Sequence, residues 1–139
     1  MTAAAVSTGS LSDVSHRLGH LLNDRTTMAQ WWVDLAGELD ELAARLMADS
    51  QSAWQALQGQ LTLDAPHLSS QLRRIDAEQE DLQSQVLRVR VLTGLSAGDP
   101  ESARTVRAAV RDLLHRLRRV EERTTGVLYD AYGRDFGGE

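Results

Sequence analysis

Apolar side chains recur at alternating spacings of four and three residues along most of this chain. Such spacing places them on one face of an α-helix. The two clearest stripes are Leu72, Ile75, Gln79, Leu82, Val86 and Val89, and then Val106, Val110, Leu113, Leu117, Val120, Thr124 and Val127 or Leu128. A chain with this pattern buries its stripes by packing helix against helix, so the sequence predicts an all-α fold.

Two short stretches mark where helices should begin. In "TLDAPHL", Asp64 is placed to cap a helix with Pro66 in its first turn, and in "SAGDPES" Asp99 and Pro100 repeat the arrangement. These signals predict one helix over about 66–94 and another over about 100–131. Because a short loop joins them, the two helices should pack antiparallel.

The first sixty residues allow two interpretations. One heptad register, interrupted by Arg25, contains Leu11, Val14, Leu18, Leu21, Met28, Trp32, Leu35, Leu39, Leu42 and Leu46. If "NDRTTMAQ" is a turn in which Thr27 and Gln30 form a capping box, a short first helix precedes a long second one. If it is not, residues 10–60 form one rod that a second chain would have to cover, as in a homodimeric scaffold.

We favour the turn, because it yields a closed bundle from a single chain. The predicted fold is an antiparallel, up-down four-helix bundle whose first helix is short. We expect it to span residues 10–132, with a flexible tail over 1–9 and a second tail over 133–139.

Composition restricts the classes of function. The chain has no cysteine, which removes disulfides, thiolate metal sites and thiol nucleophiles. The formal net charge of −5 gives no general attraction to nucleic acid or to anionic membranes. No apolar run is long enough to cross a bilayer, and the start lacks the features of a secretory signal. The expected location is the cytoplasm.

Residues able to support catalysis or metal binding do not gather on the stripes. His16 and His20 share a helix face, but that face points away from the stripe of Val14 and Leu18. The carboxylates flank the stripes, whereas a di-metal bundle site needs several acids that point inward. The chain also lacks a nucleophile elbow and a glycine-rich phosphate loop. We therefore expect no enzyme activity, no cofactor and no metal.

Two segments resemble a known family. "LDAPHLSSQLRRIDAEQEDLQSQVLRV" and "LLHRLRRVEERTTGVLYDAYGRDFGGE" are similar to the last two helices and the tail of hemerythrin-like (HHE cation-binding) domains. In that family the third helix reads Glu-His before a Leu stripe. The fourth reads His-Glu-x-x-Glu and, in one bacterial subset, continues into a Leu-x-Glu-Ala-Tyr tail. The resemblance covers about half the chain and implies a four-helix bundle.

The positions that match the family's iron ligands carry other residues here. Gln79 and Val120 stand where the family has ligand histidines, and Thr124 replaces a ligand glutamate. In the second helix, the nearest register places Leu46 and Ser50 at the remaining His and Glu positions. The resemblance therefore implies a bundle that has lost its di-iron site. The expected function is a protein-binding or regulatory module; the alternative is an oxygen, iron or redox sensor with unconventional ligands.

An amide on an apolar stripe needs an explanation. When the helices fold antiparallel about residues 63 and 97, Ser50, Gln79 and Thr124 lie at comparable heights. They should then either bond one another in a polar layer left by the lost metal, or Gln79 acts alone to fix the helix register.

The expected partner is a protein or a second copy of this chain. Its predicted contact surface is the aromatic end of the chain, formed by Tyr129, Tyr132 and Phe136.

Overall fold

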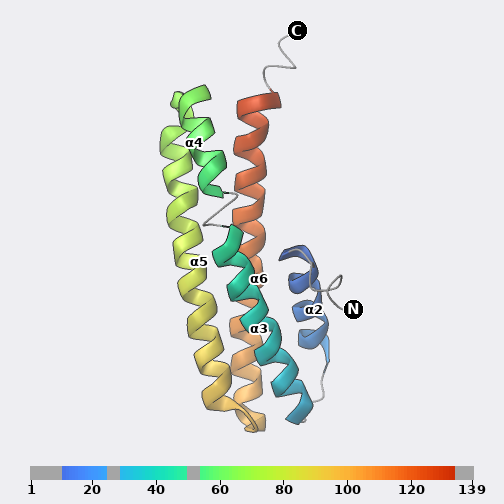
Figure 1. Cartoon of the computed structure of the whole chain (residues 1–139). Helices are drawn as coiled ribbons and strands as arrows, with labels where there is room; N and C mark the ends of the chain where they lie inside the picture. The colour runs from blue at the N-terminus through green and yellow to red at the C-terminus, as the bar shows by residue number, and fades with distance from the viewer. Residues whose placement is uncertain (1–10, 25–28, 50–53, 134–139) are drawn as a thin grey trace, which may run out of the picture.

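Two long antiparallel helices, α5 (Ser69–Ser96) and α6 (Pro100–Leu128), form the most extensively packed pair in the structure (Figure 1). It is a computed structural model that describes residues 11–24, 29–49 and 54–133. The other elements are α2 (Leu11–Asn23), α3 (Ala29–Asp49), α4 (Gln55–Asp64), a 3₁₀-helix (Pro66–Leu68) and a π-helix (Tyr129–Gly133). Across these three ranges there is no strand, so the prediction of an all-α chain is confirmed.

The loop between α5 and α6 forms as the sequence predicts. Asp99 is the N-cap of α6: its Oδ1 accepts from the backbone N–H of Glu101 at 3.1 Å, and its Oδ2 accepts from the hydroxyl of Ser102 at 2.6 Å. These hydrogen bonds, above all the one from Ser102, lower the pKa of the Asp99 carboxyl. Gly98 supplies the turn with a φ of 87°, a conformation that other residues rarely adopt.

The other predicted cap is wrong. Asp64 is the last residue of α4 rather than the N-cap of the next helix, and its Oδ2 accepts from Gln60 Nε2 one turn back. The backbone N–H of Ala65 still donates to the carbonyl of Leu61, so α4 continues up to the turn. The chain then passes through the 3₁₀-helix at Pro66 before α5 begins.

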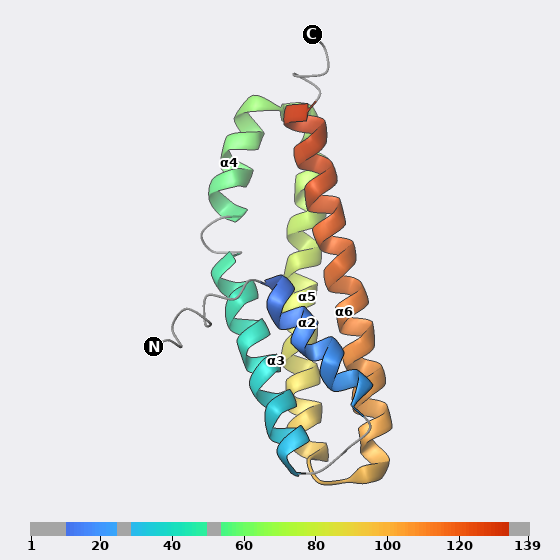
Figure 2. The ribbon, with the colours of Figure 1, turned by 90° about the vertical axis from the view of Figure 1, so that its right-hand side faces the viewer.

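Helices α2 and α3 run antiparallel and contact each other, so the break predicted after Asn23 is confirmed and the single rod over 10–60 is wrong (Figure 2). Trp31 Nε1 donates to the carbonyl of Leu21 at 3.0 Å, and Arg17 pairs with Glu38 at 2.9 Å. The capping residue Thr27 lies outside the described residues.

The long second helix expected from the sequence is also wrong, because this segment forms two helices. Helix α3 ends at Asp49 and α4 begins at Gln55, with residues 50–53 outside the description. The local sequence "ADSQS" contains Asp and Ser, whose side chains compete for backbone hydrogen bonds and weaken helices.

The core has two parts. The larger part joins α2, α3, α5 and α6, from Val14 and Leu18 to Val110 and Leu113. The smaller part joins α4, α5 and α6, around Trp54, Leu61, Ile75 and Val127. Helix α2 lies beside α3 and α6 and does not extend along α4 (Figures 1 and 2). Four helices thus enclose one part of the core and three enclose the other.

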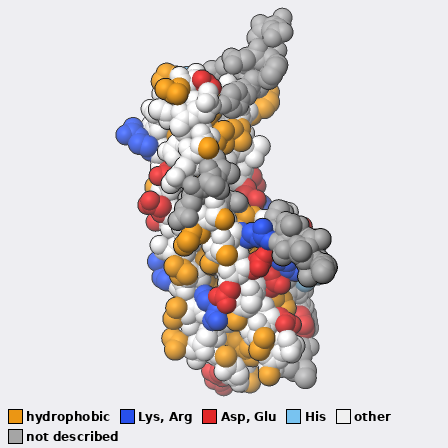
Figure 3. Space-filling view, in the orientation of Figure 1, with side chains coloured by type: hydrophobic (Ala, Val, Ile, Leu, Met, Phe, Trp, Pro, Cys, Tyr) orange, Lys and Arg blue, Asp and Glu red, His pale blue; other side chains and the backbone are white. Residues whose placement is uncertain are grey.

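Some large apolar side chains remain at the surface. Leu87, Val91 and Leu95 follow one another at intervals of four on α5 and are all exposed. Figure 3 shows hydrophobic side chains at the surface over α5 and α3. Within the described part of the chain, no helix is long and apolar enough to cross a membrane.

Candidate functional site

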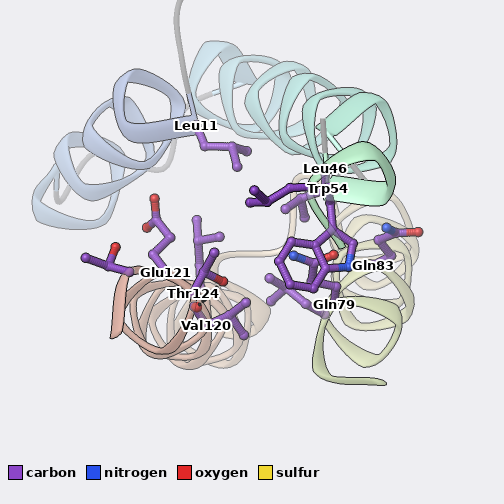
Figure 4. Close-up of a pocket in the computed structure, with 12 residues that line it drawn as sticks. Leu11, Leu46, Trp54, Gln79, Gln83, Val120, Glu121 and Thr124 are labelled. Atoms are coloured by element: carbon purple, nitrogen blue, oxygen red, sulfur yellow. Dashed lines mark hydrogen bonds between the residues drawn. The ribbon is translucent and has the colours of Figure 1, made fainter. Parts of the chain in front are cut away.

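Four of the five residues predicted for the vestigial site line a single pocket of about 410 Å³. Leu46 comes from α3, Gln79 from α5, and Val120 and Thr124 from α6, and Figure 4 shows their side chains around the same space. The fifth residue, Ser50, lies outside the described residues. Gln79 and Thr124, which we expected at one level, thus line the same pocket.

The pocket lies where the two parts of the core meet. Leu11, the first residue of α2, lines it from one side, and Trp54 and Leu57 at the start of α4 line it from another. Because α2 begins at this level, no part of it lies along the α4 half of α6. Among the described residues, the pocket thus lies beside the first turn of α2.

The walls are mainly apolar with a few polar groups. Apolar side chains from all five α-helices contribute, namely Leu11, Leu46, Trp54, Leu57, Leu82, Leu117 and Val120. The polar side chains are Gln79, Gln83, Glu121, Thr124 and Thr125. An apolar lining with a few polar groups is typical of small-ligand sites.

Gln79 and Thr124 do not bond each other, and Ser50, the third member of the expected polar layer, lies outside the described residues. The side chain of Gln79 is half-buried, and its Oε1 is buried without a hydrogen-bond partner among the described residues. Thr124 donates instead to the carbonyl of Val120 on its own helix, at 2.9 Å. A threonine within a helix often donates to the carbonyl four residues back in this way.

A different amide joins α5 to α6. Gln85 is buried; its Nε2 donates to Asp112 Oδ2 at 3.1 Å, and its Oε1 accepts from Arg116 Nη1 at 2.8 Å. Gln85 lies off the apolar stripe, so the heptad pattern gave no reason to single it out. It is the amide that links the two long helices at a defined register.

Glu78, the acid that directly precedes Gln79 on α5, is directed elsewhere. Glu78 forms an ion pair with Arg123, and it lines a separate hollow of about 130 Å³ between α5 and α6 with Arg116 and Arg119. Its second oxygen, Oε1, is buried without a partner among the described residues. Glu78 does not line the pocket of Gln79.

Glu121 stands at the rim of the pocket and was not singled out as a site residue by sequence. It is exposed, yet loss of part of its hydration raises the pKa of its carboxyl, while the charge of Arg118 acts in the opposite direction. Among the described residues, Glu121 makes no hydrogen bond or ion pair. It is an exposed acid on which the charge of Arg118 acts without forming an ion pair.

Metal-ligating side chains do not converge. His16, His20, His67 and His115 are all exposed, and the rings of His16 and His20 meet edge to face at 4.9 Å. In the ranges that the structure covers, no three His, Asp or Glu side chains are grouped so that they could hold a metal ion. The pocket instead offers apolar contact, two amides, two hydroxyls and one carboxylate.

The predicted partner surface is described only in part. The side chain of Tyr129 is 72% exposed at the end of α6. Phe136 and the side chain of Tyr132 lie outside the described residues.

Comparison of the chain with protein-family models, with curated proteins and with solved structures finds no match. The functional reading therefore rests on the residues and their geometry.

The same substitution at two glutamines of α5 should change stability in opposite directions. Gln79→Leu replaces an amide whose buried oxygen is unpaired, so we expect a gain of up to about 1 kcal/mol in the free energy of unfolding. Gln85→Leu removes two hydrogen bonds between helices and should cost about 1 kcal/mol. Urea unfolding of both variants measures the difference. If Gln79→Leu destabilises as much as Gln85→Leu, Gln79 has a bonding partner.

Proposed function

We propose that this chain is a non-catalytic regulatory module with a hemerythrin-like four-helix bundle, in which the level of the metal ligands has become a pocket for a small ligand. One observation carries the proposal. Leu46, Gln79, Val120 and Thr124, which the resemblance assigns to former ligand positions, line the same pocket although they come from three helices.

The packing of the helices supports the bundle. Helices α2, α3, α5 and α6 contact one another around the larger part of the core. In this proposal, α3 and α4 together correspond to the second helix of a hemerythrin-like bundle, and α2 is a shortened first helix. In the described part of the chain, α2 begins at Leu11, which lines the pocket.

The chemistry of the walls supports binding over catalysis. The volume of about 410 Å³ lies within the range of about 300–1,000 Å³ that is usual for small-ligand sites. Leu, Val and Trp side chains dominate the described lining, and apolar contact is what they supply. The lining contains one titratable group, Glu121, and no histidine or serine beside it among the described residues.

A regulatory role requires that ligand binding in the pocket change the binding of a partner. We propose a protein partner or a second copy of this chain, which would contact the exposed end of α6 at Tyr129. The pocket and this end are close in the chain: Thr124 of α6 lines the pocket, and Tyr129 begins the π-helix that directly follows α6. A ligand that orders α6 at Thr124 is therefore close enough to change how Tyr129 is presented.

Filling the pocket should remove ligand binding without unfolding the chain. In Thr124→Phe, the ring would occupy the pocket, so we expect binding of octan-1-ol, a neutral apolar probe, to be lost. Thr105→Phe is the matched control, since Thr105 is exposed on the same helix. Calorimetric titration of the parent and both variants measures binding, and circular dichroism checks the helix content. If all three bind the probe equally, the pocket is not the site.

The origin of the pocket can be tested by restoring the ligands. The parent should contain no stoichiometric iron after growth in iron-rich medium. The triple variant Gln79→His, Val120→His and Thr124→Glu should bind about one divalent ion such as Zn²⁺, and the ion should raise its melting temperature.

A matched control carries the same residue types on the outer faces of the same helices, as Ser84→His, Glu122→His and Thr105→Glu. This control should show no stabilisation by the metal. One or two irons in the parent would instead support the runner-up, a metal-binding sensor with unconventional ligands. A triple variant that folds and ignores the metal would contradict the shared ligand level.

A further inference from the structure

The charge of the pocket is one-sided. Of the twelve described residues that line it, Glu121 alone carries an ionisable side chain, and there is no Arg or His among them. Figure 4 shows the Glu121 carboxylate on the α6 side, across the pocket from the indole of Trp54. The described lining therefore combines one negative group at an edge with an apolar interior.

We propose that the pocket binds a small amphipathic cation, whose apolar body lies between Leu46, Trp54 and Val120 and whose ammonium-type head group lies at Glu121. This inference rests on the proposed function, because it names the class of ligand for the same pocket. It goes beyond that proposal by assigning a charge to the ligand and a role to Glu121.

The surroundings of Glu121 favour a cation over other head groups. Glu121 is exposed at the rim, where the charge of Arg118 acts on it, and it makes no ion pair among the described residues, so a bound ammonium would contact it directly. Partial removal from water, which also raises the pKa of this carboxyl, strengthens such an attraction relative to a fully solvated acid. A carboxylate head group at the same place would meet repulsion.

Basic residues near the rim lie on its other side. Arg118, His16 and His20 line a neighbouring hollow of about 420 Å³ between α2 and α6, which Glu121 also borders. None of the three lines the pocket itself. An anionic head group would have to reach past Glu121 to meet them, whereas a cation meets Glu121 directly.

The interior of the pocket indicates that the body of the ligand is apolar. Trp54 is buried, and its indole N–H is already used in a hydrogen bond to Asp76 Oδ1 at 3.2 Å. The indole therefore offers apolar contact rather than a donor. Gln83 also lines the pocket and can accept from a donor on the ligand, whereas Gln79 Oε1 is buried.

Three probes with one tail and different head groups test the inference. Octylamine, octan-1-ol and octanoate are titrated into the full chain by calorimetry at pH 8, below the concentrations at which they aggregate. We expect octylamine to bind about two- to fivefold more tightly than octan-1-ol, the gain of a partly exposed ion pair, and octanoate to bind most weakly. In Glu121→Gln the preference for octylamine should disappear.

Glu122→Gln is the matched control, because Glu122 is exposed on the same turn and does not line the pocket. Glu122→Gln should keep the preference for octylamine. That result would show that the net charge of the chain does not cause the preference. Melting curves check that both variants fold.

The outcomes separate the two proposals. If none of the probes binds, the proposed function fails together with the inference. If all three bind equally, or octanoate binds best, the pocket stands as a ligand site and the cationic ligand is overturned. If Glu122→Gln removes the preference as fully as Glu121→Gln, the attraction is general and the role of Glu121 is overturned.

Discussion

The structure depends on an inequality of length between packed helices. Helices α5 and α6 have 28 and 29 residues, whereas α2 has 13. At 1.5 Å per residue, α2 covers about 20 Å of stripes that are about 43 Å long. Burial of apolar surface holds the pair together along its whole length, but four helices complete the core over only part of it. The division of the core and the position of the pocket both follow from this inequality.

Much of the fold was predictable because the information is local. The stripes around Leu82 and Leu113 are regular enough to give α5 and α6, and the cap at Asp99 works as its sequence suggests. The prediction that Asp64 caps the next helix was wrong because an Asp-x-Pro pattern fits either the end of one helix or the start of the next. The division of α3 from α4 was missed because the apolar pattern resumes after "ADSQS" with nearly the same register.

The sequence allowed us to predict at which height the site residues lie, but not which of their side chains form hydrogen bonds. A heptad register places Gln79, Val120 and Thr124 at one height, because height depends only on spacing along antiparallel helices. Which polar groups meet depends on how the helices turn about their axes, so Gln85 rather than Gln79 forms the bonds between helices. The sequence did not predict Glu121 as a site residue for a related reason. Glu121 lines the pocket together with Leu11 of α2, and the spacing of residues along α6 does not predict which residue of α2 lies there.

The central claim is that an accessible apolar space separates the two parts of the core, and xenon tests it most directly. Xenon enters apolar cavities of this kind without needing polar contacts. In methyl NMR spectra recorded with and without dissolved xenon, the methyl groups of Leu46, Leu117 and Val120 should shift. Those of Leu39 and Val110, which are fully buried away from the pocket, should stay in place. Unchanged spectra at Leu46, Leu117 and Val120 would contradict the account.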